Sequence, residues 1–217
     1  MAAAPHEDRG RGRLFVIAAP SGAGKTSLVK ALLERRPELH VSISHTTRKR
    51  RATEEHGREY YFVEPDEFLA LRDDGQFLEH AQVFDNYYGT GRRPVEQKLA
   101  EGRNVILEID WQGARQVRKA MPDCVSIFIL PPSRRVLEER LRNRNTDSEE
   151  VIARRLRDAE GDMSHWKEFD FVVVNDDFDR AVDDLSRIID GRGNDLAASR
   201  PALGPLLRDL VGPGAGP

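Results

Sequence analysis

The sequence has 217 residues, of which 39% are hydrophobic and 33% are charged, so we expect one globular domain with a modest core and polar lobes, or two small domains. The net charge of −3 excludes a general electrostatic attraction to nucleic acid or membrane surfaces, and no apolar run approaches the roughly 20 residues needed to span a bilayer. The single cysteine, Cys124, excludes an internal disulfide, which indicates a reducing, cytoplasmic location.

The predicted strands are short apolar runs. Residues 1–12 come first; they mix both charge signs without an apolar segment, so we expect a flexible N-terminus and no secretory signal. Four runs follow, at 14–18, 105–109, 125–130 and 171–174, with a weaker one at 41–44. They are rich in Val, Ile and Phe and mostly lack alternation, which is typical of strands buried on both faces of a parallel sheet. We therefore predict a five-stranded parallel core sheet.

Helical patterns lie between these runs. Residues 26–36 place Leu28, Leu32 and Leu33 on one face, and Pro37 marks the end of that helix. Residues 94–100 precede the strand at 105–109, and residues 113–120 follow it. Strands that alternate with helices predict an α/β fold, in which a doubly wound parallel sheet is flanked by helices.

Two segments are too long to be simple connections in such a fold. We interpret residues 45–92 as a small mixed lobe, and residues 133–165, which are dense in arginines and acids, as a helical lid. The core then comprises residues 13–44, 93–132 and 166–190. The tail at 191–217 is rich in Gly and Pro, so we expect it to be poorly ordered, with at most one short helix near 206–211.

Residues 18–27 read Ala-Ala-Pro-Ser-Gly-Ala-Gly-Lys-Thr-Ser, close to the phosphate-loop pattern of Gly, four residues, Gly-Lys and Ser or Thr. The stretch joins a predicted strand to a predicted helix, where backbone N–H groups can converge on phosphate oxygens. We expect Lys25 to bridge the β- and γ-phosphates of ATP, and the Thr26 hydroxyl to ligate Mg²⁺. The expected ATP-binding residues of the loop are Ala19, Pro20, Ser21, Gly22, Ala23, Gly24, Lys25, Thr26 and Ser27.

Ala19 stands where the pattern asks for its first glycine. Because it precedes Pro20, it is pushed toward an extended conformation, which alanine adopts easily. Gly22 and Gly24, where the backbone must approach phosphate, remain glycine. We therefore predict a working loop.

Further motifs lie in and after the predicted mixed lobe. Residues 42–51 read Ser-Ile-Ser-His-Thr-Thr-Arg-Lys-Arg-Arg, 57–62 Gly-Arg-Glu-Tyr-Tyr-Phe, 77–81 Phe-Leu-Glu-His-Ala, 86–90 Asn-Tyr-Tyr-Gly-Thr and 110–113 Asp-Trp-Gln-Gly. With these motifs and the loop, the chain resembles the guanylate kinases, the bacterial enzymes above all, from about residue 14 to about residue 189. The resemblance implies the P-loop nucleoside monophosphate kinase fold and transfer of the γ-phosphoryl of ATP to GMP, giving ADP and GDP, with Mg²⁺.

The resemblance also implies the residues of the site. Those expected at the GMP phosphate are Arg48, Arg51, Tyr60 and Tyr88, and those around guanine are Ser44, Glu79, Thr90 and Asp110. Those expected over the transferring phosphoryl, together with Lys25 and Arg48, are the lid arginines Arg140, Arg144 and Arg155. Asn175 is expected at the ATP base or ribose, and Glu108 is expected to help organise Mg²⁺ through water.

The chemistry of these side chains agrees with that assignment. A dianionic monophosphate suits arginine forks and tyrosine hydroxyls. Guanine presents N1–H and N2–H₂ donors on one edge, and a carboxylate such as Glu79 accepts both, whereas adenine mismatches it. Taken alone, the basic run 48–51 would be a solvated surface segment, Tyr60 and Tyr88 would be ordinary half-buried aromatics, and Glu79 would be a surface acid. Their joint occurrence at the family spacing favours a GMP site.

The chain departs from the family pattern at two positions. Arg50 replaces the usual Pro between the two phosphate-binding arginines, and Thr53 replaces the usual Gly before the glutamate, which affects the reach of Arg51. His45 and His80 lie within the GMP motifs, and we expect them to pack behind the site. No general base is required if GMP arrives as a dianion.

Two alternatives remain. A guanylate-kinase-like module without catalysis would lack the intact loop and would travel with other interaction domains, for which we expect no room here. A related kinase of phosphorylated sugars would lack the guanine-reading residues. The expected partners are ATP and GMP, with dGMP a further substrate, and no nucleic acid or membrane; the chain is expected to be a monomer or a homo-oligomer.

Overall fold

The computed structural model describes residues 10–83, 85–142 and 149–212. The chain forms two compact units. Among the described residues, the first covers 10–15, 37–83, 85–107 and 112–125, and the second covers 16–36, 108–111, 126–142 and 149–212. None of the described helices is long and apolar enough to cross a membrane.

The core sheet has five strands, as predicted, in the order β2-β7-β1-β8-β9. These are β2 (His40–Val41), β7 (Val105–Glu108), β1 (Leu14–Ala18), β8 (Val125–Leu130) and β9 (Phe171–Val174). The β2–β7 and β8–β9 pairs are parallel. All five residues of β1 are buried, which explains why this strand shows no polar alternation. The strand expected at 41–44 lies instead at β2, because Ser42 already leaves the ladder after one last backbone bond to Ile106.

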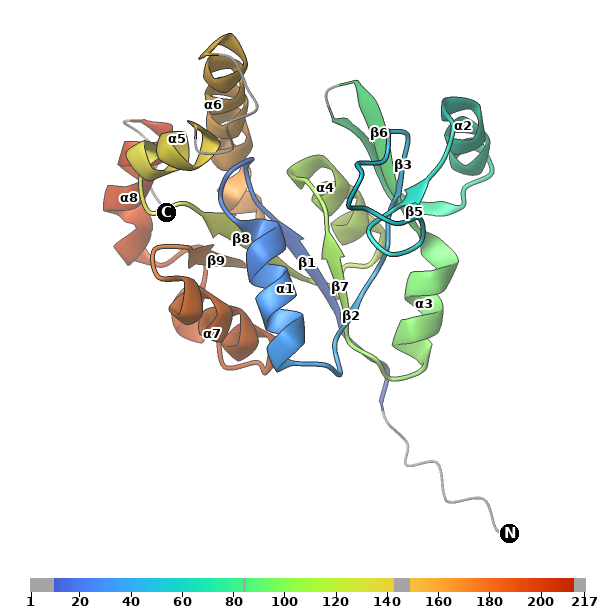
Figure 1. The fold of residues 1–217 in the computed structure, drawn as a ribbon. Helices are drawn as coiled ribbons and strands as arrows, with labels where there is room; N and C mark the ends of the chain where they lie inside the picture. Colours follow the sequence, from blue (N-terminus) through green and yellow to red (C-terminus); the bar gives the residue numbers. More distant parts are fainter. Residues whose placement is uncertain (1–9, 84, 143–148, 213–217) are drawn as a thin grey trace. The chain divides into compact units, whose positions relative to one another are not determined.

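In the first unit, a separate mixed sheet runs in the order β4-β3-β6-β5. Its strands are β3 (His45–Thr46), β4 (Tyr61–Phe62), β5 (Phe77–Val83) and β6 (Asn86–Gly91). The β3–β4 pair is parallel, while β3–β6 and β5–β6 are antiparallel. Helix α2 (Pro65–Asp73) lies beside β5 and buries Phe68 against the rings of Phe77 and Tyr87 (Figure 1). The expectation of a small mixed lobe is confirmed.

Two further helices connect to the core strands of this unit. Helix α3 (Arg92–Ala100) contacts β5 and buries Val95 and Leu99. Helix α4 (Trp111–Ala120) follows β7 and buries Ala114 and Val117. Both helices begin two residues earlier than predicted, because Gly91 and Asp110 end the preceding segments and the chain turns directly into the first helical turn.

The second unit is helical apart from its share of the core strands. Helix α1 (Lys25–Arg35) lies beside α7 (Phe178–Ile189), and Arg35 forms ion pairs with Asp179 and Asp183 of that helix (Figure 1). The segment expected to be a helical lid contains α5 (Arg134–Arg142) and α6 (Glu149–Met163), followed by the short 3₁₀ helix η1 (Ser164–Glu168).

The tail differs from the expectation of a poorly ordered segment. It contains the 3₁₀ helices η2 (Asn194–Leu196) and η3 (Pro201–Leu203), and then α8 (Gly204–Val211), which contacts α6. The physical reason is apolar spacing within a Gly- and Pro-rich composition. Leu196, Leu203, Leu207 and Leu210 are all buried, and the prolines open helices, where no N–H donor is needed.

Candidate functional site

The phosphate loop joins β1 to α1, as the sequence predicts. Gly22 (φ 88°) and Gly24 (φ 94°) both have left-handed backbone conformations, so these are the two positions where glycine is needed. A Cβ atom on Gly24 would also lie 2.5 Å from Nδ2 of Asn175. Helix α1 begins directly after Gly24, so its first N–H groups are available to an anion at the loop.

Three side chains at this loop carry charge or oxygen ligands. Lys25 donates from Nζ to the carbonyl oxygen of Ile109 at 2.9 Å, which anchors its side chain beside the end of β7. Burial raises the pKa of the Glu108 carboxyl, while the Lys25 charge and a hydrogen bond from Thr26 lower it. Lys25, Thr26 and Glu108 are therefore brought together within the second unit.

This donor set fits the Mg²⁺ ion that the fold family implies. A hydroxyl and a carboxylate are hard oxygen ligands, and Mg²⁺ usually takes one or two of these, with water and substrate phosphates completing its coordination. Among the described residues, no three His, Cys, Asp or Glu side chains form a metal cluster. Thr26 and Glu108 are thus the residues that would hold the ion.

Asn175 and Arg140 both bind the backbone of the phosphate loop. The Asn175 side chain is buried and donates from Nδ2 to the Ala23 carbonyl at 2.8 Å. Arg140 donates from Nη2 to the Asn175 carbonyl at 3.0 Å and from Nη1 to the Ala23 carbonyl at 3.4 Å. The Asn175 amide therefore supports the loop from the end of β9. Of the other lid arginines expected, Arg155 lies half-buried on α6, and Arg144 lies outside the described residues.

In the first unit, Glu54 organises the predicted phosphate-binding arginines. Arg48 donates from Nη2 to Oε1 of Glu54 at 2.7 Å and from Nη1 to Oε2 at 3.1 Å, a two-pronged charged pair. The backbone N–H of Arg51 donates to Glu54 Oε2 at 2.8 Å, and the Arg51 side chain is 73% exposed. The hydrogen bond with Arg48 lowers the pKa of Glu54 and raises the pKa of Arg48.

The substitution at Arg50 adds to this loop. Arg50 donates from Nη1 to the Glu54 carbonyl at 3.1 Å, so the side chain that replaces proline fastens the same turn. The Thr53 carbonyl accepts a hydrogen bond from Arg58 at 3.1 Å. The Arg50 side chain therefore has a partner within the loop, whereas the Thr53 contact is made by a backbone carbonyl that glycine would also supply.

Aromatic rings surround Arg48. Its guanidinium carbon lies 5.5 Å from the ring centroid of Tyr60 and 5.8 Å from that of Phe62. The rings of Tyr60 and Tyr88 meet edge to face with centroids 5.9 Å apart, and a hydrogen bond with Tyr88 contributes to the raised pKa of Arg48. Arg48, Tyr60 and Tyr88, all predicted to bind the GMP phosphate, thus form one cluster.

A second cluster in this unit contains the predicted guanine-reading residues. Glu79 lies opposite Thr90 on β5 and β6, and the ladder shifts register between Phe77 and Glu79. Because of this irregularity, Phe77, Leu78 and Glu79 are all buried in succession. Thr90 donates from Oγ1 to Oε1 of Glu79 at 2.5 Å, and its hydroxyl lies 3.1 Å from that of Ser44.

Of the two histidines in these motifs, His45 packs against aromatic rings as expected, whereas His80 is exposed, so the expectation that it packs behind the site is wrong. The His45 ring contacts the rings of Tyr61 and Phe77 at centroid distances of 4.8 and 5.3 Å. His80 is fastened through its backbone, which exchanges two hydrogen bonds with the Gln116 amide. Burial lowers the pKa of both imidazoles.

Two groups of functional interest were missed by sequence reasoning. Glu54 could have been found as the acid that follows an arginine run by three residues. The second group is a contact between Trp111, which follows the predicted guanine reader Asp110, and Asp162 on α6, for which the sequence carries no local signal. Asp110 itself lies at the start of α4 in the second unit.

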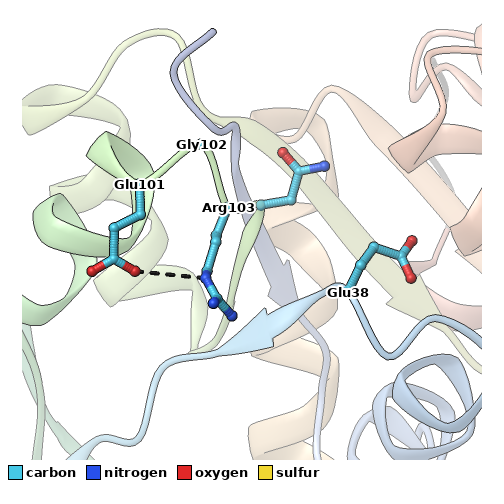
Figure 2. Close-up of a pocket in the computed structure, with 5 residues that line it drawn as sticks. Glu38, Glu101, Gly102 and Arg103 are labelled. Atoms are coloured by element: carbon cyan, nitrogen blue, oxygen red, sulfur yellow. Dashed lines mark ion pairs between the residues drawn. The ribbon is translucent and has the colours of Figure 1, made fainter. Parts of the chain in front are cut away.

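One cavity in the first unit lies away from the predicted residues. It has a volume of about 590 Å³, and Figure 2 shows its lining at the turn after α3. Glu101 pairs with Arg103 there at 3.6 Å. The lining residues are Glu38, Glu101, Gly102, Arg103 and Asn104, none of which belongs to the predicted site.

Comparison with known proteins agrees with these features. A family model described as guanylate kinase matches residues 11–192. A guanylate kinase from Methylococcus capsulatus is 55% identical over 202 residues, which cover 93% of this chain and 99% of that protein. One from Alkalilimnicola ehrlichii is 54% identical over 201 residues, with 93% and 99% covered. The crystal structure of guanylate kinase from Anaplasma phagocytophilum matches with a TM-score of 0.71 and 35% identity, covering 85% of this chain and 87% of that one.

Proposed function

Because this chain belongs to the guanylate kinase family, we propose that it transfers the γ-phosphoryl group of ATP to GMP, giving ADP and GDP. The observation that carries the proposal is a series of hydrogen bonds that links the hydroxyls of Ser44 and Thr90 to the buried carboxylate of Glu79. The Arg48 cluster lies in the same unit. The Glu79 carboxylate is 3% exposed and accepts a hydrogen bond from Thr90, and a carboxylate is the acceptor that suits the two donors guanine offers.

The Arg48 cluster is the proposed site of the GMP phosphate. Glu54 holds the Arg48 guanidinium in one orientation before substrate arrives, which reduces the entropy lost on binding. Tyr60 and Tyr88 add hydroxyl donors, and the exposed side chain of Arg51 can reach a phosphate without leaving a buried pocket. The loop is thus preorganised at Arg48 and adaptable at Arg51.

Base selection is assigned to Ser44, Glu79, Thr90 and Asp110. The Thr90 hydroxyl fixes one carboxylate oxygen of Glu79, so the carboxylate plane is set by the protein. Guanine N1–H and N2–H₂ can donate to this carboxylate, whereas adenine presents an acceptor at N1 and no 2-amino group. We expect AMP to leave Glu79 mismatched.

The phosphate loop and the lid arginines supply the transfer step. Lys25 would contact the γ-phosphoryl group as it is transferred. Arg140, Arg144 and Arg155 would add positive charge where the equatorial oxygens of that group become more negative. Thr26 and, through water, Glu108 would hold Mg²⁺, which would supply positive charge to offset that of the ATP phosphates. A closed lid would exclude the water that otherwise hydrolyses ATP.

The alternatives are not favoured. A non-catalytic binding module has no use for the intact loop with Gly22, Gly24, Lys25 and Thr26. A phosphosugar kinase has no use for a buried carboxylate held by Thr90, whose hydroxyl in turn bonds that of Ser44.

An ADP-release assay with ATP and Mg²⁺ across GMP, AMP, CMP and UMP tests the proposal. We expect GMP to be phosphorylated at least ~100-fold more efficiently than the other three, because a mismatched buried polar group costs several kcal/mol. Equal rates with all four monophosphates would overturn the assignment.

A further inference from the structure

Trp111 is held from two sides by the end of helix α6 and the turn that follows it. Its Nε1–H donates to Oδ1 of Asp162 at 3.0 Å. Its ring stacks on the imidazole of His165, with centroids 3.6 Å apart and an angle of 18° between the planes. His165 in turn contacts Oε1 of Glu168 through Nδ1 at 2.8 Å. These contacts, all within the second unit, form what we call the Trp111 clamp: Trp111, Asp162 and His165 (α4 and α6 in Figure 1).

The clamp fixes a short segment with little freedom of its own. Trp111 is the first residue of α4 and follows Asp110 directly, and Asp110 follows the end of β7. The Ile109 N–H also bonds to the Ile17 carbonyl at 3.2 Å. The backbone is thus held at Ile109, and the Trp111 side chain is held at the edge and the face of its ring. Asp110 lies between these two residues, so contacts on either side of it set its orientation.

The Asp162 carboxylate holds the Trp111 indole at a cost in folding stability. Burial raises the pKa of its carboxyl to about 6; nearby Asp110 and Asp158 also raise it, while the Trp111 hydrogen bond and His165 lower it. Its ionised form is thus disfavoured in the folded protein, and a neutral acceptor would stabilise the fold more. Groups that cost stability and lie next to a functional segment are more often retained for function than for packing.

We propose that Asp162 is a positioning residue for guanine recognition: by holding the Trp111 indole, it fixes the orientation of Asp110 and so links helix α6 to the affinity for GMP. The inference rests on the proposed function and on the role assigned to Asp110 there. Helix α6 belongs to the segment expected to close over the phosphates, and this proposal adds a role for it in binding the guanine base.

Steady-state kinetics of Asp162→Ala test this role. We expect KM for GMP to rise about tenfold, since small misplacements of a binding group cost up to ~100-fold, while KM for ATP stays within about twofold. The ratio of kcat/KM for GMP to that for AMP should fall with it. Asp162→Asn keeps an oxygen acceptor for the indole N–H and should restore KM for GMP to within about threefold of the wild-type value.

A second variant acts on the same bond from its other end. Trp111→Phe keeps a ring to stack on His165 but removes the N–H donor, so it should reproduce the Asp162→Ala effect, and the double variant should add less than about twofold. The matched control is Glu150→Ala, an exposed acid near the start of α6; it should leave KM for GMP unchanged.

The outcomes separate the two levels of inference. A wild-type enzyme that does not phosphorylate GMP overturns the proposed function and this inference together. A wild-type enzyme that does so, with variants whose GMP KM is unchanged or whose GMP and ATP KM values rise equally, overturns the positioning role alone. Circular dichroism and thermal midpoints of each variant identify a general loss of folding. If Asp162→Ala does not fold, the GMP KM values of the milder variants Trp111→Phe and Asp162→Asn test the positioning role.

Discussion

Thr90 and Glu79 face each other across the β5–β6 ladder, and the threonine hydroxyl donates to the glutamate carboxylate at 2.5 Å. Neither side chain has substantial access to solvent, with 0% and 3% of their surfaces exposed. The pair exists because the ladder shifts register just before Glu79, which turns an acid inward on a strand whose alternation would otherwise expose it. The orientation of this buried acid suits the role in guanine recognition that we propose for it.

Replacing this carboxylate should change base selection. Glu79→Gln presents an amide that can accept only one of the two guanine donors and places its own N–H₂ against the other. We expect kcat/KM for GMP to fall on the order of 100-fold and the preference for GMP over AMP to shrink with it. Competition assays with both monophosphates measure this ratio. Glu67→Gln, an exposed acid on α2, is the control, and a GMP preference that survives Glu79→Gln would contradict the role.

The Glu54 pairing predicts a different effect. Glu54→Gln removes the charge that holds Arg48 and weakens the bond to the Arg51 N–H. A charge-assisted bond contributes about 1.5–3 kcal/mol, so we expect KM for GMP to rise roughly tenfold, with kcat less affected. The neighbouring Glu55→Gln changes an exposed acid paired with Arg58 and should have no such effect. If both variants behave alike, Glu54 does not organise the arginines.

Lys25→Ala should separate transfer from GMP binding. The lysine acts on ATP phosphates in the second unit, so its loss should reduce turnover by more than about 1,000-fold, the scale of one lost electrostatic catalyst. Calorimetry should find GMP affinity within about twofold of the wild-type value. Lys30→Ala, an exposed lysine on the same helix, is the control. Loss of GMP affinity in Lys25→Ala would undermine this division of roles.

The Asp162 carboxyl predicts a pH dependence of stability. Its pKa is about 6 in the folded protein and 3.8 ordinarily, so the folded state binds the proton more tightly. The free energy of unfolding should therefore fall as pH rises from about 4 to about 6, by an amount on the order of 1–2 kcal/mol after allowance for solvent screening. Urea titrations of wild type and Asp162→Asn across this range measure it. The variant should lose the decline, while Asp123→Asn, an exposed acid elsewhere, should keep it.

The C-terminal helix should contribute to folding. Leu207 on α8 is fully buried, and Leu207→Ala should cost about 2–5 kcal/mol of unfolding free energy. Its neighbour Leu206 is only half-buried, so Leu206→Ala should cost clearly less. Chemical denaturation of both variants gives the comparison. Equal, small costs would mean that α8 is not part of the folded core.

Much of the fold could be predicted because its signals are local. The runs at 14–18, 125–130 and 171–174 are strands with the bounds expected, since a strand buried on both faces must be apolar along its whole length. The tail could not be predicted in the same way. Its glycines and prolines indicate disorder by composition, and only the packing of four leucines several residues apart offsets that tendency.

The sequence by itself determined the phosphate loop and the identity of the groups for phosphate and guanine, because Gly22, Gly24 and Lys25 act through backbone geometry and spacing within ten residues. Only the tertiary structure decided which acids hold those groups. Glu54 meets Arg48 through the fold of a loop, and Asp162 meets Trp111 across 51 residues of chain. The first contact lies within six residues and has a local signal, an acid after an arginine run. The second depends on how whole elements pack, and packing leaves no periodic pattern in the sequence from which it could be predicted.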